Sequence, residues 1–260
     1  MDIVRLNTNG RFRYINKKSR KKIHDRHLPR IQSLKIPPAY HRVRISYDPK
    51  SKVQAIGLDD MNRKQYVYHP NHLEESRELK FTDLINFGRK IKRIRKEMNN
   101  SMVNFVNSGQ RLPTRDDVIN LVLFLIDKCN FRVGCDKYKK LYNSYGVTTL
   151  NKNHFEFKNN KVSIEFVGKK GVVNKSDVTH TNVCNVLHSL CDKNNKEYVF
   201  CYENNGEVFR ITERHINDFL KKYHKTLTVK MFRTWNANYI LLKEILNHDI
   251  PNDEKGAKKN

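Results

Sequence analysis

The sequence lacks long apolar runs and a regular pattern of cysteines. No apolar stretch approaches the roughly 18 residues of a membrane-spanning helix, and charges lie at the N-terminus, where a secretory signal needs an apolar core. The five cysteines are odd in number and irregularly spaced, which does not indicate a disulfide framework and suits a reducing compartment. We therefore expect an intracellular protein without a membrane anchor.

Acidic residues are also scarce. Only 27 Asp and Glu oppose 51 Lys and Arg, which gives a formal net charge of +24 spread along the whole chain. Such a charge attracts polyanions, so nucleic acid is the first expected partner and an anionic membrane the second. Because the acids form no cluster of the kind that binds metal ions, neither a metal nor another cofactor is expected.

One group of residues could in principle bind a metal. His180, Cys184, His188 and Cys191 would share one face of a helix predicted over residues 177–191. Ligands spread along several turns of a straight helix cannot converge on one tetrahedral ion. A structural role is therefore the better interpretation.

What the sequence does contain is enough apolar material to fold. Hydrophobic residues make up 38% of 260 residues, with thirteen Phe and twelve Tyr, which suits one large or two modest domains. A change of periodicity near Leu79 predicts a β-rich domain over residues 1–78 and a mainly helical domain over residues 79–260. The expected fold class is α+β, with a small N-terminal antiparallel β domain followed by a mainly α-helical domain that contains a β-hairpin.

The N-terminal third begins with a polar, basic segment over residues 1–35, and two prolines at Pro37 and Pro38 then exclude a helix. From His41 the residues alternate as in short antiparallel strands joined by polar turns. The third of these strands carries a mixture suited to DNA, with cations for phosphates, an amide for a base edge and hydroxyls for the backbone. Its residues are Arg63, Lys64, Gln65, Tyr66 and Tyr68. A solvated edge strand with tyrosines packed below it fits this pattern equally well.

The helical part opens with a basic helix from about Phe81. Thr114 is placed to cap a second helix, which buries its apolar face and ends at Asn130, so that Arg132 falls at a helix-to-turn junction. A β-hairpin follows, and the tight turn over residues 167–172 projects Lys169 and Lys170. Helices are predicted at 177–191 and 212–224, with β-like segments at 198–202 and 207–211 between them.

The stretch Leu227–Ala237 places Lys230 and Arg233 one helical turn apart among apolar residues. A helix is predicted over residues 230–247, with a core-facing stripe made of Met231, Trp235, Tyr239, Leu242 and Leu246. Arg233 lies off that stripe on the first turn, where free backbone N–H groups favour phosphate binding. An ordinary arginine paired with a carboxylate is the alternative.

Together, two arginines at helix boundaries and a lysine on a hairpin tip suit phosphoryl transfer on DNA without a metal. Two forked guanidiniums, Arg132 and Arg233, can neutralise the charge that gathers on the oxygens of a pentavalent phosphorane. A lysine, Lys169 or Lys170, can protonate the departing oxygen. The spacing alone does not choose between the two lysines.

Seven short stretches are spread over nearly the whole chain. They are Leu28-Pro-Arg-Ile31, Ile36-Pro-Pro-Ala39, Val53-Gln-Ala-Ile-Gly57, Arg63-Lys-Gln-Tyr-Val-Tyr-His-Pro70, Phe131-Arg-Val-Gly134, Phe166-Val-Gly-Lys169 and Lys230-Met-Phe-Arg-Thr234. In these stretches and in their order the chain resembles a type IB DNA topoisomerase, of the small branch found in poxviruses, giant viruses and some bacteria.

The resemblance implies a monomeric clamp around duplex DNA, which relaxes supercoils through a 3′-phosphotyrosyl intermediate and religation. By matching motifs, Arg132 and Arg233 would hold the scissile phosphate and Lys169 would be the general acid, with Lys170 as its substitute. Gln65, Tyr66 and Tyr68 would contact DNA, as would the cations Arg63, Lys64, Lys170 and Lys230. A viral member would act in the virion, the viral factory or the cytoplasm.

One part of the family pattern has no counterpart. The family places a His in a His-Thr-Pro context, and then the nucleophilic Tyr in a Ser-Tyr or Ala-Tyr pair, farther beyond the second arginine than Asn260 lies. Tyr239 continues the predicted stripe and His248 lacks the context, so we expect this 260-residue chain to lack the nucleophile. The alternatives are a catalytically inactive DNA-binding relative and a tyrosine recombinase, which shares the catalytic fold.

Overall fold

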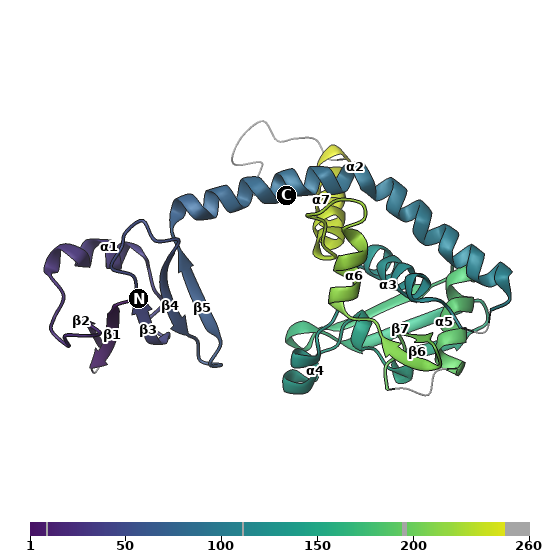
Figure 1. The fold of residues 1–260 in the computed structure, drawn as a ribbon, viewed down its shortest axis with the longest axis horizontal. Coiled ribbons are helices and arrows are strands. Elements are labelled where there is room, and N and C mark those ends of the chain that lie inside the picture. Colours follow the sequence, from purple (N-terminus) through teal and green to yellow (C-terminus); the bar gives the residue numbers. More distant parts are fainter. Residues whose placement is uncertain (9, 111, 194–196, 248–260) are drawn as a thin grey trace. The chain divides into compact units, whose positions relative to one another are not determined.

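The computed structural model describes residues 1–8, 10–110, 112–193 and 197–247 (Figure 1). Contacts divide the chain into two compact units, Met1–Phe81 and Thr82–Asn260, each with its own hydrophobic core. The first carries an antiparallel sheet, and the second is mainly helical with two small sheets. The predicted α+β class is confirmed.

The first unit is built on a five-stranded antiparallel sheet with the order β2-β1-β3-β4-β5. Its strands are β1 (Ile3–Thr8), β2 (Arg11–Asn16), β3 (His41–Ile45), β4 (Val53–Leu58) and β5 (Lys64–Tyr68), and a short helix α1 (Leu28–Ser33) lies between β2 and β3. The core of this unit consists of Ile3, Ile23, Ile31, Val43, Ile45 and Ala55.

Strands β1 and β2 lie in the segment that the sequence indicated only as polar and basic. The pattern is hidden because a buried position of β1 holds Arg5, which is only 7% exposed. Its guanidinium donates to the backbone oxygens of Ile36 and Pro37 at 3.3 and 3.0 Å. A charge with such partners can be buried, so the strand does not show apolar alternation.

Helix α2 (Pro70–Ser108) begins well before the predicted start at Phe81 and continues far beyond Ile94. Proline is favourable at a first helical position, because its missing N–H would have no partner there. The buried face of α2 consists of Phe87, Ile91, Ile94, Met98, Met102 and Phe105. The opposite face is exposed and carries Arg89, Lys92, Arg93 and Lys96.

Helix α3 (Arg115–Cys129) lies at the centre of the second unit and contacts α6 (Glu213–Leu220), α7 (Lys230–Asn247) and β9 (Cys201–Asn204). Every residue from Val118 to Asp127 is buried. Its start is the predicted one. The Thr114 hydroxyl accepts from the Asp117 backbone N–H at 3.3 Å, and the Asp117 carboxylate accepts from the Thr114 N–H at 3.1 Å, which forms a capping box.

The remaining elements of this unit include the two strands, β7 (Lys161–Val167) and β8 (Val173–Val178), that flank the turn carrying Lys169 and Lys170. Strands β6 (Phe155–Lys158), β7 and β8 form an antiparallel sheet, while β9 and β10 (Glu207–Arg210) form a hairpin. The short helix α4 (Asp136–Tyr142) precedes them, and α5 (Thr181–Lys193) lies between the two sheets in sequence. The helix predicted from residue 177 starts later because β8 extends to Val178. None of the described helices is both long and apolar enough to cross a membrane.

The predicted core-facing stripe of α7 is wrong, although the helix has the predicted bounds. Phe232 and Asn236 are its buried residues, with Met231 and Trp235 packed partly against the core. Beyond them the helix is exposed, with Tyr239 at 61%, Leu242 at 55% and Leu246 at 74%. Periodicity locates an apolar face but not the length of core that lies against it, and only the first two turns of α7 meet that core.

Candidate active site

Arg132 lies on a short segment that leaves the end of α3. Asn130 closes that helix in the left-handed conformation, with φ 54° and ψ 28°, which asparagine tolerates better than most residues. Phe131 is 2% exposed and packs edge-on against Phe166 of β7, with ring centroids 4.9 Å apart. The Arg132 side chain itself is exposed. The segment therefore anchors its backbone in the core while it presents the guanidinium to solvent.

Backbone contacts fix the same segment from its other side. Val147 N–H donates to the Arg132 carbonyl at 2.8 Å, and Thr148 donates to the Val133 carbonyl from its N–H at 2.7 Å and from its hydroxyl at 2.8 Å. The approach is close, since a Cβ at Gly146 would lie 2.6 Å from the Arg132 oxygen. Only glycine fits there.

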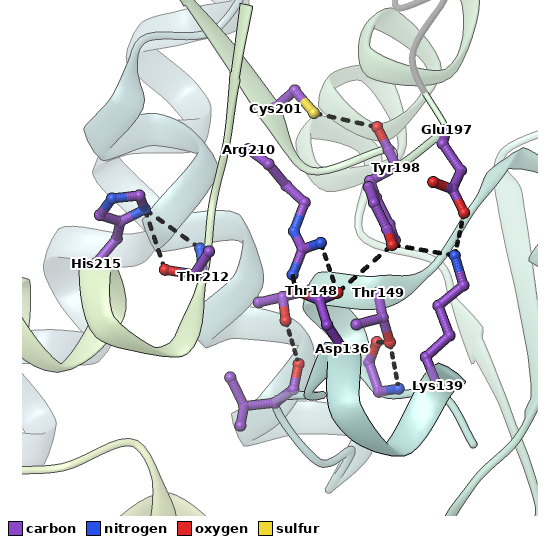
Figure 2. Close-up of polar contacts among 12 residues, drawn as sticks. Asp136, Lys139, Thr148, Thr149, Glu197, Tyr198, Cys201, Arg210, Thr212 and His215 are labelled. Carbon is purple, nitrogen blue, oxygen red and sulfur yellow. Dashed lines mark hydrogen bonds and ion pairs between the residues drawn. The ribbon is translucent and has the colours of Figure 1, made fainter. Parts of the chain in front are cut away.

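A polar network then holds α4, the helix that follows Arg132 (Figure 2). The Asp136 carboxylate accepts two hydrogen bonds from the Arg210 guanidinium, at 2.7 and 3.0 Å, and this interaction lowers the pKa of Asp136. The same guanidinium lies 4.1 Å above the ring of Tyr198, whose hydroxyl accepts from Lys139 at 3.2 Å. Lys139 also pairs with Glu197. The network joins α4 to the β9–β10 region and limits movement of the segment that begins at Arg132.

Arg233 lies on the first turn of α7, as predicted. Its Nε atom is buried and has no hydrogen-bond partner among the described residues. Burial lowers the pKa of Arg233, and the positive charge of Arg132 lowers it further. The two guanidiniums thus repel each other, and among the described residues no carboxylate forms an ion pair with Arg233. This arrangement can bind an anion between them.

The lysine tip is exposed. Lys169 and Lys170 lie between β7 and β8, and Lys170 has a left-handed backbone with φ 64°. The turn is held by Gly168 N–H, which donates to the Val172 carbonyl at 2.7 Å, and by the Asn174 side-chain amide, which donates to the same oxygen at 3.0 Å. Both lysines project from this turn, and its geometry does not distinguish one from the other.

The predicted DNA-binding residues lie on β5, except Arg63, which immediately precedes it. Neighbouring side chains in a strand point to opposite faces of the sheet, so these residues are divided between two faces. Arg63 and Gln65 both donate to Asp59 Oδ2 at 2.8 Å. Tyr66 and Tyr68 stack with centroids 6.1 Å apart, and Tyr66 is 47% exposed. Lys64 is exposed as well. Tyr66 is therefore accessible, whereas Tyr68 beside it is half-buried.

The structure contradicts the core position predicted for Tyr239. Its side chain is 61% exposed on the half of α7 that does not meet the core. His248 lies outside the described residues. Lys230, at the first position of α7, is exposed as a DNA-binding residue would be.

Sequence patterns missed the polar residues that support the arginines. Asn130 and Asn236 lie close to Arg132 and Arg233 in sequence, and Asp136 and Arg210 pair across a long stretch of chain. One signal was present: Asn236 is a polar residue within the predicted apolar helix. A polar residue on a buried helix face needs a partner, and its position therefore points to a network.

Most of the chain matches known families. Residues 64–260 match the model of the eukaryotic DNA topoisomerase I catalytic core, and residues 11–59 match the N-terminal domain of bacterial DNA topoisomerase IB. The chain belongs to the type IB DNA topoisomerase family. Lys169, Arg132 and Arg233 all lie within the stretch that matches the catalytic core.

Individual family members resemble the chain over different lengths. DNA topoisomerase 1B of Acanthamoeba polyphaga mimivirus is 28% identical over 99% of this chain and 77% of its own length. DNA topoisomerase I of monkeypox virus is 25% identical over 72% of this chain and 55% of its own length. DNA topoisomerase 1 of Mycosarcoma maydis is 27% identical over 57% of this chain. The chain thus spans about three quarters of the giant-virus relative and about half of the poxvirus one.

Proposed function

We propose that this chain binds duplex DNA and activates one phosphodiester for the strand cleavage and religation of a type IB topoisomerase. The observation that carries the proposal is the Arg132–Arg233 pair. Arg233 has a buried Nε without a partner among the described residues, beside a second positive charge. A site of this kind is stabilised when an anion enters it, and a DNA phosphate is the anion that a +24 protein attracts.

In the proposed reaction the two arginines bind the non-bridging oxygens of the scissile phosphate. They stabilise the negative charge that grows there as a tyrosine oxygen attacks phosphorus and the bond to the 5′-oxygen breaks. Lys169 donates a proton to that leaving oxygen, or Lys170 does so in its place. No metal or other cofactor is invoked, because the guanidiniums supply the positive charge. The reverse attack of the 5′-hydroxyl reseals the strand.

The tyrosine is the open component of the proposal. Tyr40, Tyr47 and Tyr145 follow Ala39, Ser46 and Ser144, but all three precede Arg233, whereas the nucleophilic pair of the family follows the second arginine. We assign the role to none of the twelve tyrosines. Tyr239, the tyrosine nearest to Arg233 in sequence, has an exposed side chain on α7. We therefore expect these 260 residues to bind DNA in the cell as a monomer. We do not expect them to relax supercoiled DNA.

DNA binding is tested first by its salt dependence. Because phosphate contacts release counterions, log affinity for duplex DNA should fall steeply and linearly with log salt, and EDTA should have little effect. Fluorescence anisotropy with a labelled duplex measures both. A slope near zero, or binding that EDTA abolishes, contradicts the proposed electrostatic, metal-independent interaction.

Catalysis is tested with supercoiled plasmid, denatured with SDS after incubation. The expected result is no relaxed topoisomers and no covalent adduct, because arginines without a positioned nucleophile cannot complete the reaction. An adduct at any tyrosine would overturn that expectation and identify the nucleophile directly. A chain extended to carry a nucleophilic tyrosine should relax the plasmid; site-specific strand joining instead would favour a recombinase.

A further inference from the structure

A network of polar side chains, in which Asn236 and Asp127 are buried and Asn130 is exposed, joins the elements that carry Arg132 and Arg233. Its centre is Asn236, which lies one turn after Arg233 on α7 and is 9% exposed. The Asn236 Nδ2 group donates to Asn130 Oδ1 at 3.0 Å, and Asn130 lies two residues before Arg132. One side-chain hydrogen bond thus connects the helix of Arg233 with the segment of Arg132.

Asn236 uses both ends of its amide. Nδ2 also donates to the Asp127 backbone carbonyl at 2.6 Å, while Oδ1 accepts from Arg95 Nη2 at 3.3 Å. The opposite amide orientation would leave these groups unmatched, because a carbonyl cannot donate and a guanidinium cannot accept. The hydrogen bonds therefore define a single rotamer and a single placement of α7 against α3.

An ion pair whose carboxylate is buried supports Asn236 from α2. Arg95 donates to both carboxylate oxygens of Asp127, from Nε at 2.9 Å and from Nη2 at 2.8 Å, and the Asp127 side chain has no exposed surface. The bidentate geometry specifies direction as well as distance. Through it, α2, the end of α3 and the first turns of α7 meet at one point.

The arginine pair needs a support of this kind. Arg132 and Arg233 carry like charges, and their mutual repulsion favours separation until an anion lies between them. Neither guanidinium can hold the other in place. The spacing of the two groups in the absence of DNA must come from the backbone elements behind them, and small displacements of binding groups are costly.

We propose that Asn236 is a positioning residue: through Asn130 and Asp127 it holds α7 against the end of α3, so that Arg132 and Arg233 are spaced for one phosphate before DNA binds. Asn236 itself touches no substrate. The inference rests on the proposed function, since it requires that the two arginines share an anion.

Inorganic phosphate is a suitable probe, because it requires neither a nucleophile nor a known DNA sequence. The 260-residue chain is titrated with phosphate while NMR follows the arginine Nε–Hε signals, assigned with Arg132→Lys and Arg233→Lys. Asn236→Ala removes the centre of the network. Asn130→Gly removes only its acceptor, and glycine readily adopts the φ of 54° found there.

Two controls separate positioning from other effects. Asn143 caps the end of α4 with φ 47°, so Asn143→Gly repeats the same replacement in a similar backbone conformation on another helix. Thr114→Ala removes the cap at the opposite end of α3 and should lower the melting temperature without changing phosphate affinity. A loss of stability alone therefore cannot imitate the expected result.

In the unmodified chain the signals of both arginines should shift with one Kd. Asn236→Ala and Asn130→Gly should each weaken phosphate binding about tenfold, while the two controls stay within about twofold. Unchanged affinity in either folded variant, or an equal loss in Asn143→Gly, overturns the positioning role alone. If Asn236→Ala does not fold, Asn130→Gly decides. Arginine signals that do not respond in the unmodified chain overturn the shared phosphate site as well.

Discussion

The arginine pair and the lysine tip are held in different ways. Arg132 and Arg233 extend from a helix end and a helix start that pack into the core of the second unit, and Arg233 Nε is itself buried. Lys169 and Lys170 lie on an exposed turn beside Val172, which is 59% exposed. The proposed phosphate-binding charges thus extend from packed elements, whereas the proposed proton donor lies on a surface turn. Substitutions can test this difference.

The largest effect is expected at the arginines. In a chain extended to carry a nucleophilic tyrosine, Arg132→Ala or Arg233→Ala should slow cleavage on the order of a hundredfold or more, because each removes charge stabilisation in the transition state. DNA affinity should change little, since many other cations contribute to it. Single-turnover cleavage and anisotropy measure the two quantities. Loss of affinity and cleavage in equal proportion would contradict a role specific to the transition state.

The lysine tip should respond differently to the leaving group. Lys169→Ala should slow cleavage on the order of a hundredfold, and a 5′-bridging phosphorothiolate, whose sulfur leaves without a proton, should restore the rate. Lys170→Gly is the matched control, because it removes the neighbouring charge and relieves the left-handed backbone at φ 64°. If the phosphorothiolate substrate restores cleavage by a Lys170 variant but not by Lys169→Ala, Lys170 is the general acid.

The core behind Arg233 should be sensitive to crowding. A Cβ at Gly88 of α2 would lie 2.4 and 2.5 Å from Cζ3 and Cη2 of Trp235, so Gly88→Ala must displace the indole of Trp235 or, with it, α7 near Arg233. We expect a loss of roughly 1–3 kcal/mol in unfolding free energy and about tenfold slower cleavage. Gly88→Ala combined with Trp235→Phe should recover both, because phenylalanine lacks the second ring of indole. Denaturant unfolding measures the stability of both variants, and single-turnover assays measure their cleavage rates. A fully active, equally stable Gly88→Ala variant would show that the contact between Gly88 and Trp235 does not fix α7.

The smallest effect is expected from the support of the lysine tip. Asn174→Ala removes one exposed hydrogen bond to the Val172 carbonyl, worth about 1 kcal/mol at most. Cleavage should slow only a few fold, and global stability should be unchanged. A loss as large as that of Lys169→Ala would mean that the tip is as rigidly prearranged as the arginine pair.

Local signals predicted several elements well. The capping box at Thr114, the bounds of α7 and the turn that carries Lys169 all follow from a few neighbouring residues, and all are present in the structure. Strand β1 was missed because Arg5 occupies a buried position, where its partners come from Ile36 and Pro37. A residue whose burial depends on distant partners carries no local signal of that burial.

The sequence by itself determined the family, the excess of positive charge, and the three segments that carry Arg132, Lys169 and Arg233. Only the tertiary structure decided what surrounds them: the buried Nε of Arg233 beside a second guanidinium, and the hydrogen bond from Asn236 to Asn130. The physical reason is that motifs and periodicity reflect interactions within a few residues. Electrostatic repulsion between arginines, and the buried polar contacts that can oppose it, depend on distances between elements far apart in the chain.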